Sequence, residues 1–376
     1  MIVGGWVHRL APLPGELLSS CLVRSALAHG TTPGRFLRLF WQGDPIWERD
    51  FDRAPAALRR TRRAAHGPDW LDDVAARLGV TRGAVEDATL TPWRVRLGGP
   101  SLAACSDTPL VLSAGIRHRR TRHALQFCPD CLAEGTPHFR RTWRLGFVVG
   151  CEAHGRALLD ACPHCDAPVM PHRTMTGRLA DCHLCGRGLD KPPHAPERAP
   201  LPASVVALQQ GLSRVLRGGG PGLPGPWPGR DAFDAVRALL AASATEPVTG
   251  RLRPALGLDG RGAPRAGRLR FEQVRLDARV PHLETVAAWL ADWPRAFRHG
   301  ADAARLTQRA FVRRRLPPAL AAEVARLDPG RAYDRSWKPI LEEPVLRRLR
   351  RTDKAAYRQL RAQRCRSAWK IDPLRG

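Results

Sequence analysis

The sequence predicts a mainly α-helical protein in which small zinc-stabilised ribbons separate a helical N-terminal domain, with a helix-turn-helix, from a helical C-terminal domain. Apolar residues recur at helical spacing before residue 126 and after residue 203. Between these segments, seven of the ten cysteines fall at residues 128–185, where helical patterns are scarce. A proline-rich run then has the composition of a stiff connector. The expected domains are residues 1–126, 127–191 and 203–376.

The N-terminal domain is expected to begin with a loop and two helices. A Pro-x-Pro-Gly segment at residues 12–15 predicts the loop. Apolar and small side chains at helical spacing from Leu18 to Ala26 predict the first helix, and Pro33 marks the start of a second, shorter one.

Residues 69–90 have the pattern of a helix-turn-helix. The first helix has its apolar residues on one face, Gly79 can end it at a tight turn, and a second helix restarts at Thr81. Arg82 and Arg94 flank this second helix, where contacts to bases or phosphates would be made if it entered the major groove. A helical pair that only packs, or that docks a protein, fits the pattern equally well.

Four closely spaced residue pairs predict two structural zinc ions. Pairs at this spacing sit on turns whose backbone amides point at the thiolates, and two such turns close a tetrahedron with no open position for water. Because the binding energy of such a site is folding energy, loss of a ligand should unfold the region. The expected ligands are, for one ion, Cys128, Cys131, Cys151 and His154 and, for the other, Cys162, Cys165, Cys182 and Cys185.

Disulfides are the alternative to metal for these cysteines. The sequence has no export signal, and clustered cysteines in an unexported chain favour metal over disulfides. Nearby histidines could also replace a ligand in one of the sites, namely His138, His164, His172 and His183.

The cysteine region and the N-terminus both contain runs that resemble a known family. The runs are Phe127-Cys128-Pro129-x-Cys131-Leu132-x-Glu134-Gly135, Arg140-Arg141-x-Trp143-Arg144-Leu145, Leu159-Asp160-x-Cys162-Pro163-x-Cys165 and, earlier, Pro12-x-Pro14-Gly15-Glu16-x-Leu18-x-Ser20. Together they resemble the TniQ/TnsD family of transposition proteins over roughly residues 8–190. Cys21 departs from the pattern, because the family often carries Trp there. Residues 250–376 match no family segment.

The resemblance implies a non-catalytic adaptor that selects the target site in a Tn7-like or mercury-transposon-like DNA transposition system. Family members recognise either a DNA sequence or a CRISPR effector complex bound at its target. They recruit an AAA+ ATPase, which in turn activates the transposase. The partners implied for this chain are therefore DNA, an AAA+ transposition ATPase, a CRISPR effector complex as one possible target, and the transposase indirectly; a homodimer is left open.

The C-terminal domain is expected to hold several helices, the last of them basic. They are expected at 204–216, after Asp231, and at 283–298, 301–315, 318–327 and 343–367, with a loop at 249–268. The last helix carries a continuous stripe of five cations, Arg347, Arg351, Lys354, Arg358 and Arg361. The stripe fits a phosphate track, and an ordinary solvated face is the alternative.

Composition and missing motifs limit the function classes. Lys and Arg outnumber Asp and Glu by 61 to 35, so the net charge of +26 favours a polyanionic partner over a merely solvated basic surface. No stretch approaches the roughly 20 apolar residues of a membrane span, so a cytoplasmic protein without a membrane partner is expected.

Signature motifs for catalysis are missing, so the sequence predicts that the chain is not an enzyme. No Gly-Lys-Ser/Thr loop and no His-Glu-x-x-His motif occur. His282-x-Glu284 lacks the downstream Pro-Cys-x-x-Cys pair of a zinc deaminase. The rivals to the adaptor are a sequence-specific DNA-binding transcriptional regulator with a zinc module and a protein-interaction scaffold.

Overall fold

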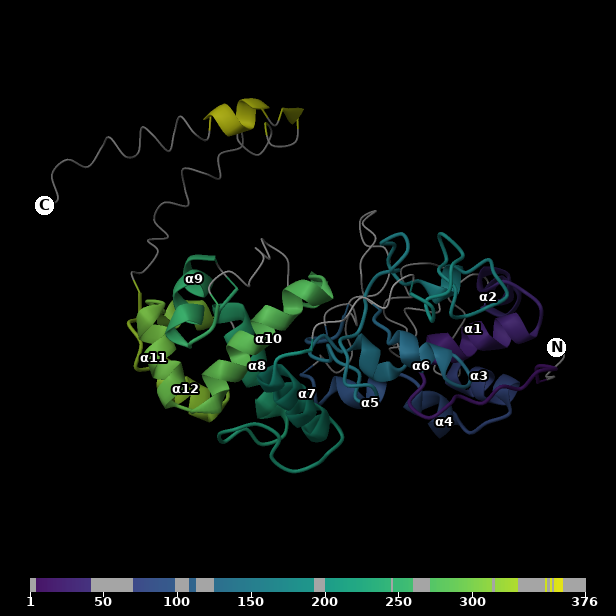
Figure 1. The fold of residues 1–376 in the computed structure, drawn as a ribbon, viewed down its shortest axis with the longest axis horizontal. Coiled ribbons are helices and arrows are strands. Elements are labelled where there is room, and N and C mark those ends of the chain that lie inside the picture. Colours follow the sequence, from purple (N-terminus) through teal and green to yellow (C-terminus); the bar gives the residue numbers. More distant parts are fainter. Residues whose placement is uncertain are drawn as a thin grey trace, which may run out of the picture. The chain divides into compact units, whose positions relative to one another are not determined.

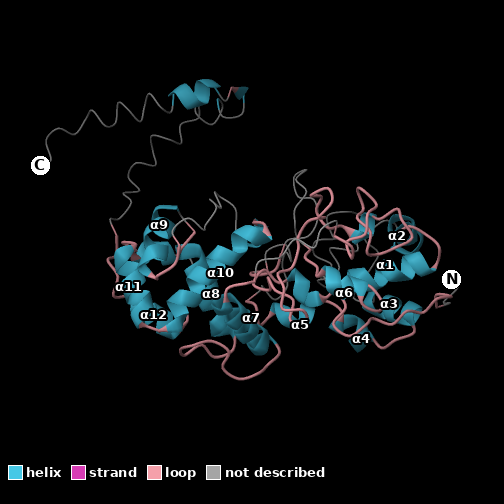
Figure 2. Cartoon of the chain, viewed as in Figure 1, coloured by secondary structure: helices cyan, strands magenta, loops and turns pink. Residues whose placement is uncertain are grey.

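The computed structural model describes residues 5–41, 70–98, 108–112, 125–192, 200–244, 246–259, 271–312 and 315–330, with short stretches of 349–360. Figures 1 and 2 show helices joined by loops, and these residues contain no strand. The mainly helical class that the sequence predicts is therefore confirmed. The chain forms two compact units, Met1–Asp328 and Pro329–Gly376, and all elements named below belong to the first.

Five helices form the N-terminal part. They are α1 (Leu18–Ala28), α2 (Pro33–Trp41), α3 (Trp70–Leu78), α4 (Arg82–Asp87) and α5 (Thr91–Arg94). The apolar faces of α1 to α4 enclose a core of their own around Trp6, whose ring lies edge-on to Phe36 at 4.6 Å between centroids. Trp93 of α5 packs against the larger core instead.

Helices α3 and α4 lie where the sequence predicts them, at residues 69–90. Gly79, in the turn between them, has φ of +71°, a conformation that costs glycine little. The Oγ1 atom of Thr81 accepts a hydrogen bond from the backbone amide of Ala84 and so caps α4. The turn and the cap explain the sharp reversal of the chain. That this pair acts as a DNA-binding helix-turn-helix stays a prediction.

The cysteine region consists of loops, with the short helix α6 (Pro129–Ala133) and two 3-10 turns at Arg141–Arg144 and Pro171–Arg173. The expected ribbons are reduced to isolated antiparallel bridges in the described residues. Those of the cysteine region are Phe127–Leu159, Gly150–Ala157, Ala161–Pro168 and Asp181–Gly188. Ordered loops with so few bridges need another source of stability.

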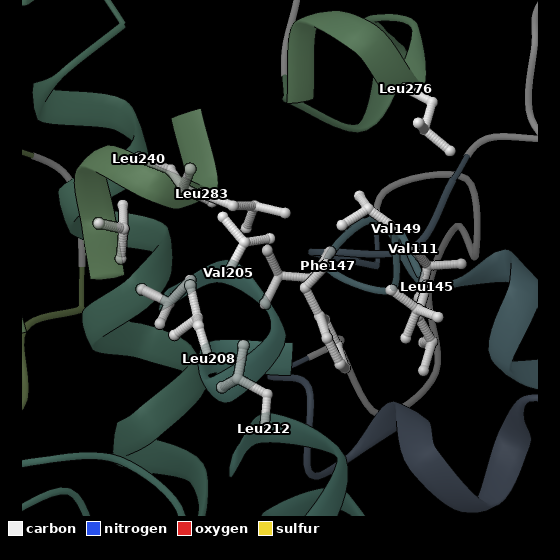
Figure 3. Packing of buried hydrophobic residues seen from close by; sticks show 14 of the residues in the cluster. Val111, Leu145, Phe147, Val149, Val205, Leu208, Leu212, Leu240, Leu276 and Leu283 are labelled. Carbon is white, nitrogen blue, oxygen red and sulfur yellow. The ribbon is translucent and has the colours of Figure 1, made fainter. Parts of the chain in front are cut away.

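Six helices follow: α7 (Ala203–Leu216), α8 (Arg230–Ala242), α9 (Glu246–Ala255), α10 (Leu276–Ala291), α11 (Arg295–Ala303) and α12 (Pro318–Val324). Figure 3 shows Val205, Leu208 and Leu212 of α7 grouped with Phe147 from the cysteine region. One continuous apolar core accordingly runs through the cysteine region and these helices.

Three expectations for the C-terminal helices are wrong. Helix α9 occupies the first part of the expected loop at 249–268, because Leu252 and Arg253 are buried and their tertiary contacts outweigh a Gly/Pro/Arg-rich composition. The expected helix at 283–298 is two helices, which separate at Asp292–Pro294, where proline disfavours helical backbone before it. The expected helix at 301–315 ends at Ala303 and is followed by a 3-10 turn.

Candidate metal centres and the contacts that hold them

The first cluster brings one histidine nitrogen and three sulfurs together. Nδ1 of His154 lies 3.5 Å from Sγ of Cys128, 3.3 Å from Sγ of Cys131 and 3.4 Å from Sγ of Cys151. All four ligand atoms lie within 4.8 Å of one another, which suits a single metal ion. Cys128 precedes the first turn of α6, and Cys131 lies within that helix. These are the four residues that the sequence predicts for one site.

A carboxylate orients the histidine of this cluster. Nε2 of His154 lies 2.9 Å from Oε1 of Glu134, so Nε2 donates to the carboxylate and Nδ1 is left facing the sulfurs. The interaction raises the pKa of His154 above its usual value, chiefly through this hydrogen bond. Metal-bound histidines commonly donate their second ring N–H in this way. In the sequence, Glu134 stands out only as part of a family-like run, and nothing there signals this role.

The second cluster contains four sulfurs. Sγ of Cys162 lies 3.8 Å from Sγ of Cys185, and Sγ of Cys165 lies 3.7 Å from Sγ of Cys182. Their ligand atoms also lie within 4.8 Å of one another. The backbone amides two residues after Cys162 and after Cys182 donate to those sulfurs at 3.4 and 3.5 Å. Such amide donors stabilise thiolates, the form that a metal requires.

Three of the four pairs share one turn geometry. The amide of the leading cysteine, Cys151, Cys162 or Cys182, donates to the carbonyl five residues later at 2.8 Å, and its carbonyl accepts from the amide four residues later at 2.9 Å. The residue four positions on has a left-handed backbone: Gly155 (φ +64°), Asp166 (φ +56°) and Gly186 (φ +70°). A repeated turn of this kind points each pair of ligands to one side.

The burial of sulfur atoms in both clusters favours a cation between the ligands. Burial is the main cause that raises the pKa of the Cys162 and Cys131 thiols, because enclosed thiolates without a countercharge are costly. A bound cation removes that penalty and allows the sulfurs to lose their protons. All eight described cysteines are free, and sulfur separations of 3.5–3.8 Å exclude disulfides within the clusters.

The four nearby histidines lie outside both clusters. Nε2 of His164 contacts the carbonyl of Gly188 at 3.1 Å, and Nδ1 of His138 contacts that of Thr136 at 2.9 Å. His172 and His183 are likewise absent from the two sets of converging ligand atoms. The eight ligands expected from the sequence therefore fit the geometry better than a site in which one of these four histidines replaces a ligand.

A buried carboxylate attaches the N-terminal helices to the first cluster. Glu16 is 1% exposed and accepts hydrogen bonds from Ser20 at 2.8 Å and from the guanidinium of Arg24 at 2.7 and 2.8 Å. The Ser20 hydroxyl accepts in turn from the amide of Phe139 at 2.9 Å, and the amide of Leu17 donates to the carbonyl of Phe139 at 2.8 Å. The family-like run at the N-terminus thus forms a structural junction.

A second buried junction joins the cysteine region to α10. Arg279 is fully buried, donates to the carbonyl of Gly146 at 3.0 Å and to Oε1 of Gln126 at 3.1 Å, and lies 3.7 Å from Oδ2 of Asp160. Burial lowers the pKa of Arg279 to about 10. Asp160 also accepts from the amide of Leu276 at 2.6 Å. Asp160, which lies two residues before Cys162 of the second cluster, therefore fixes the start of α10.

Helix α7 is joined to the first cluster by one amide side chain. Oε1 of Gln209 accepts from the backbone amides of Val149 and Gly150, each at 2.9 Å, and its Nε2 donates to the carbonyl of Gly150 at 2.9 Å. Gln209 is 4% exposed, so these bonds are sheltered from water. They hold the chain directly before Cys151.

Most cations expected at DNA lie outside the described residues. This is the case for Arg347, Arg351, Lys354 and Arg361, whereas Arg358 is exposed in a short helical stretch of the second unit. Arg82 is paired with Asp72, and Arg94 ends α5 and is partly buried. Their contact with DNA stays a prediction.

No helix among the described residues is long and apolar enough to span a membrane.

The comparisons with known proteins give one result for the family. No curated protein sequence matches the chain. Residues 7–158 match the family model TniQ, a span that holds the Glu16 junction and all four residues of the first cluster. The match indicates a transposition-associated role in target selection, with DNA and other transposition proteins involved. Residues 7–158 of the chain are therefore similar to the TniQ family.

Proposed function

We propose that this chain is a non-catalytic adaptor of a DNA transposition system, and that two structural zinc ions hold its TniQ region folded. It links a target, either DNA or a DNA-bound CRISPR effector complex, to an AAA+ ATPase and through it to the transposase, in the cytoplasm. The observation that carries the proposal is the TniQ match over residues 7–158, in a segment whose four predicted ligands converge.

Zinc is the metal that suits both donor sets. Three thiolates with one imidazole, and four thiolates, are the ligand sets of closed tetrahedral zinc sites. Every protein ligand position is filled, which leaves no open position for substrate or an activated water. The ions would therefore supply folding energy and not reaction chemistry.

The adaptor role is tested in a transposition assay that supplies an AAA+ transposition ATPase and a transposase together with this chain. With the chain present, insertions should concentrate at a defined target, and without it they should be scattered or rare. Sequencing of insertion junctions gives the measurement. Insertions that are equally frequent and equally placed without the chain would exclude target selection and leave the transcriptional regulator as the next candidate.

Metal identity is tested on purified protein. Elemental analysis should find two zinc ions per chain, and Cys131→Ser or Cys162→Ser should each lose one ion together with solubility. Cys21→Ser is the matched control, because Cys21 is buried far outside both sets of ligand atoms. Folded protein that contains no zinc would contradict the assignment.

A further inference from the structure

We propose that a groove between α5, the Arg140–Arg141 segment and the C-terminal end of α7 binds the phosphodiester backbone of DNA. This deepens the proposed function and rests on it in one respect: a target-selection adaptor is expected to contact DNA. The residues that line the surface do not include Arg82, Arg94 or the C-terminal stripe.

The groove consists of two neighbouring hollows. The first has a volume of about 450 Å³, and its walls include Gly15, Trp93, Arg96, Arg140 and Arg141. The second has a volume of about 670 Å³, and its walls include Gln210, Arg214 and Gly219. Glu152 and Arg217 line both hollows, so the two are neighbours. Two neighbouring hollows lined by several arginines fit a polyanion better than a single small anion.

The charge of the groove is strongly positive. Its walls hold one carboxylate, that of Glu152, and it pairs with Arg217 at 3.4 Å, where both side chains are substantially exposed. An exposed pair of this length contributes little and is easily exchanged for another anion. Within the described ranges, no carboxylate lies within ion-pair distance of the remaining four arginines, Arg96, Arg140, Arg141 and Arg214.

Neighbouring groups hold three of these guanidinium groups in place. The guanidinium carbon of Arg141 lies 4.6 Å from the ring centroid of Trp93, and its NH1 donates to the carbonyl of Thr89 at 3.2 Å. The guanidinium carbon of Arg140 likewise lies 5.8 Å from the ring centroid of Trp143. Arg96 donates to the carbonyl of Leu216, which offsets the negative end of α7. Arginines fixed by stacking lose little side-chain entropy when they bind a phosphate.

Donor groups at the groove are left without an acceptor. Nε of Arg140 and Nε of Arg141 are both enclosed, and neither has a hydrogen-bond partner among the described residues. Burial lowers the pKa of Arg141, and the nearby charge of Asp87 opposes that shift. A phosphate in the groove brings the negative charge that these guanidinium groups attract, although it does not reach the enclosed Nε atoms. The net charge of +26 over the whole chain adds long-range attraction for a polyanion.

The test compares two double variants in DNA binding. Arg140→Gln with Arg214→Gln removes one cation from each hollow and leaves the backbone bonds of Arg96 and Arg141 intact. Arg295→Gln with Arg309→Gln is the matched control, because both residues are exposed on α11 and the following 3-10 turn, outside the groove. Fluorescence anisotropy with a labelled duplex, over a series of salt concentrations, gives the affinity.

The groove variant should bind all duplex sequences more weakly, and its slope of log affinity against log salt should be shallower by about two units. The control should retain the wild-type slope, and zinc content and circular dichroism should be unchanged in both. A wild-type slope in the groove variant would overturn the proposal. Polyglutamate that binds the wild type but not the groove variant, without competing with DNA, would overturn it as well. Failure of targeted insertion by the wild type is a separate result, which would overturn the adaptor role instead.

Discussion

Glu134 and His154 together determine which ring nitrogen faces the first cluster. If Glu134 is changed to Gln, the ring loses a charged acceptor, and the apparent zinc affinity of this site should fall by about 10- to 100-fold. Competition with a coloured chelator measures the affinity of each site. Glu152→Gln is the control, because that carboxylate pairs with Arg217 and not with the ring. An unchanged affinity in Glu134→Gln would show that the contact is incidental.

Glu16 carries the junction between α1 and the cysteine region. Glu16→Gln leaves the Arg24 guanidinium, which is 10% exposed, without its anion, and a buried ion pair that loses one partner typically costs about 3–5 kcal/mol. We expect a clear fall in the free energy of unfolding, measured by urea denaturation. Asp302→Asn, which changes an exposed carboxylate on α11, should change it by less than about 0.5 kcal/mol.

At the scale of the element, α10 is positioned by the Asp160–Arg279 contact. Arg279→Met should destabilise the protein by about 3 kcal/mol or more, because Asp160 and Gln126 remain buried without the cation. Adding Asp160→Asn should restore part of that loss, giving a coupling energy above about 1 kcal/mol in a double-mutant cycle. Strictly additive effects would contradict a direct interaction.

Helix α10 also contributes a pH dependence through His282. Burial, with the nearby charge of Arg253, lowers the pKa of His282 below its usual value near 6.5. The unfolded chain therefore binds more protons than the folded protein as the pH falls below about 6.5, and stability should decrease with acidification. In His282→Gln, thermal unfolding should be less sensitive to pH between about 7 and 5. His299→Gln, which alters an exposed histidine, should retain the wild-type dependence.

Element prediction succeeded where local signals were complete. Helix α4 begins at a capping Thr81 after a left-handed Gly79, and both signals are visible in the sequence. The two clusters of candidate ligands were equally visible, because their spacing is set by a local turn. Helix α9 could not be placed, because it depends on the burial of Leu252 and Arg253 against distant helices. The break between α10 and α11 falls at Pro294, a local signal that the prediction of one helix at 283–298 did not use. The roles of Glu134, Gln209 and Arg279 depend on long-range contacts and left no sequence signal.

At the scale of the whole molecule, the metal sites and the C-terminal helices share one core. Treatment with a strong chelator should therefore unfold the cysteine region and also expose amides of α7 and α10. Hydrogen exchange, read by mass spectrometry, measures protection in each segment. The helices α1 to α3 enclose a separate core and should keep more of their protection. Chelation that leaves α7 and α10 fully protected would show that the two regions fold independently.

The position of Phe147 between the cysteine region and α7 also bears on how this architecture can vary. Phe147 is fully buried there, among side chains of α7 such as Val205 and Leu208. A shorter relative that ended before α7 would present this surface to water, and apolar surface of that kind promotes aggregation. Such a relative would need polar residues at these positions or a second protein chain to cover them. Loss of the C-terminal helices in evolution should thus be accompanied by one of these two changes.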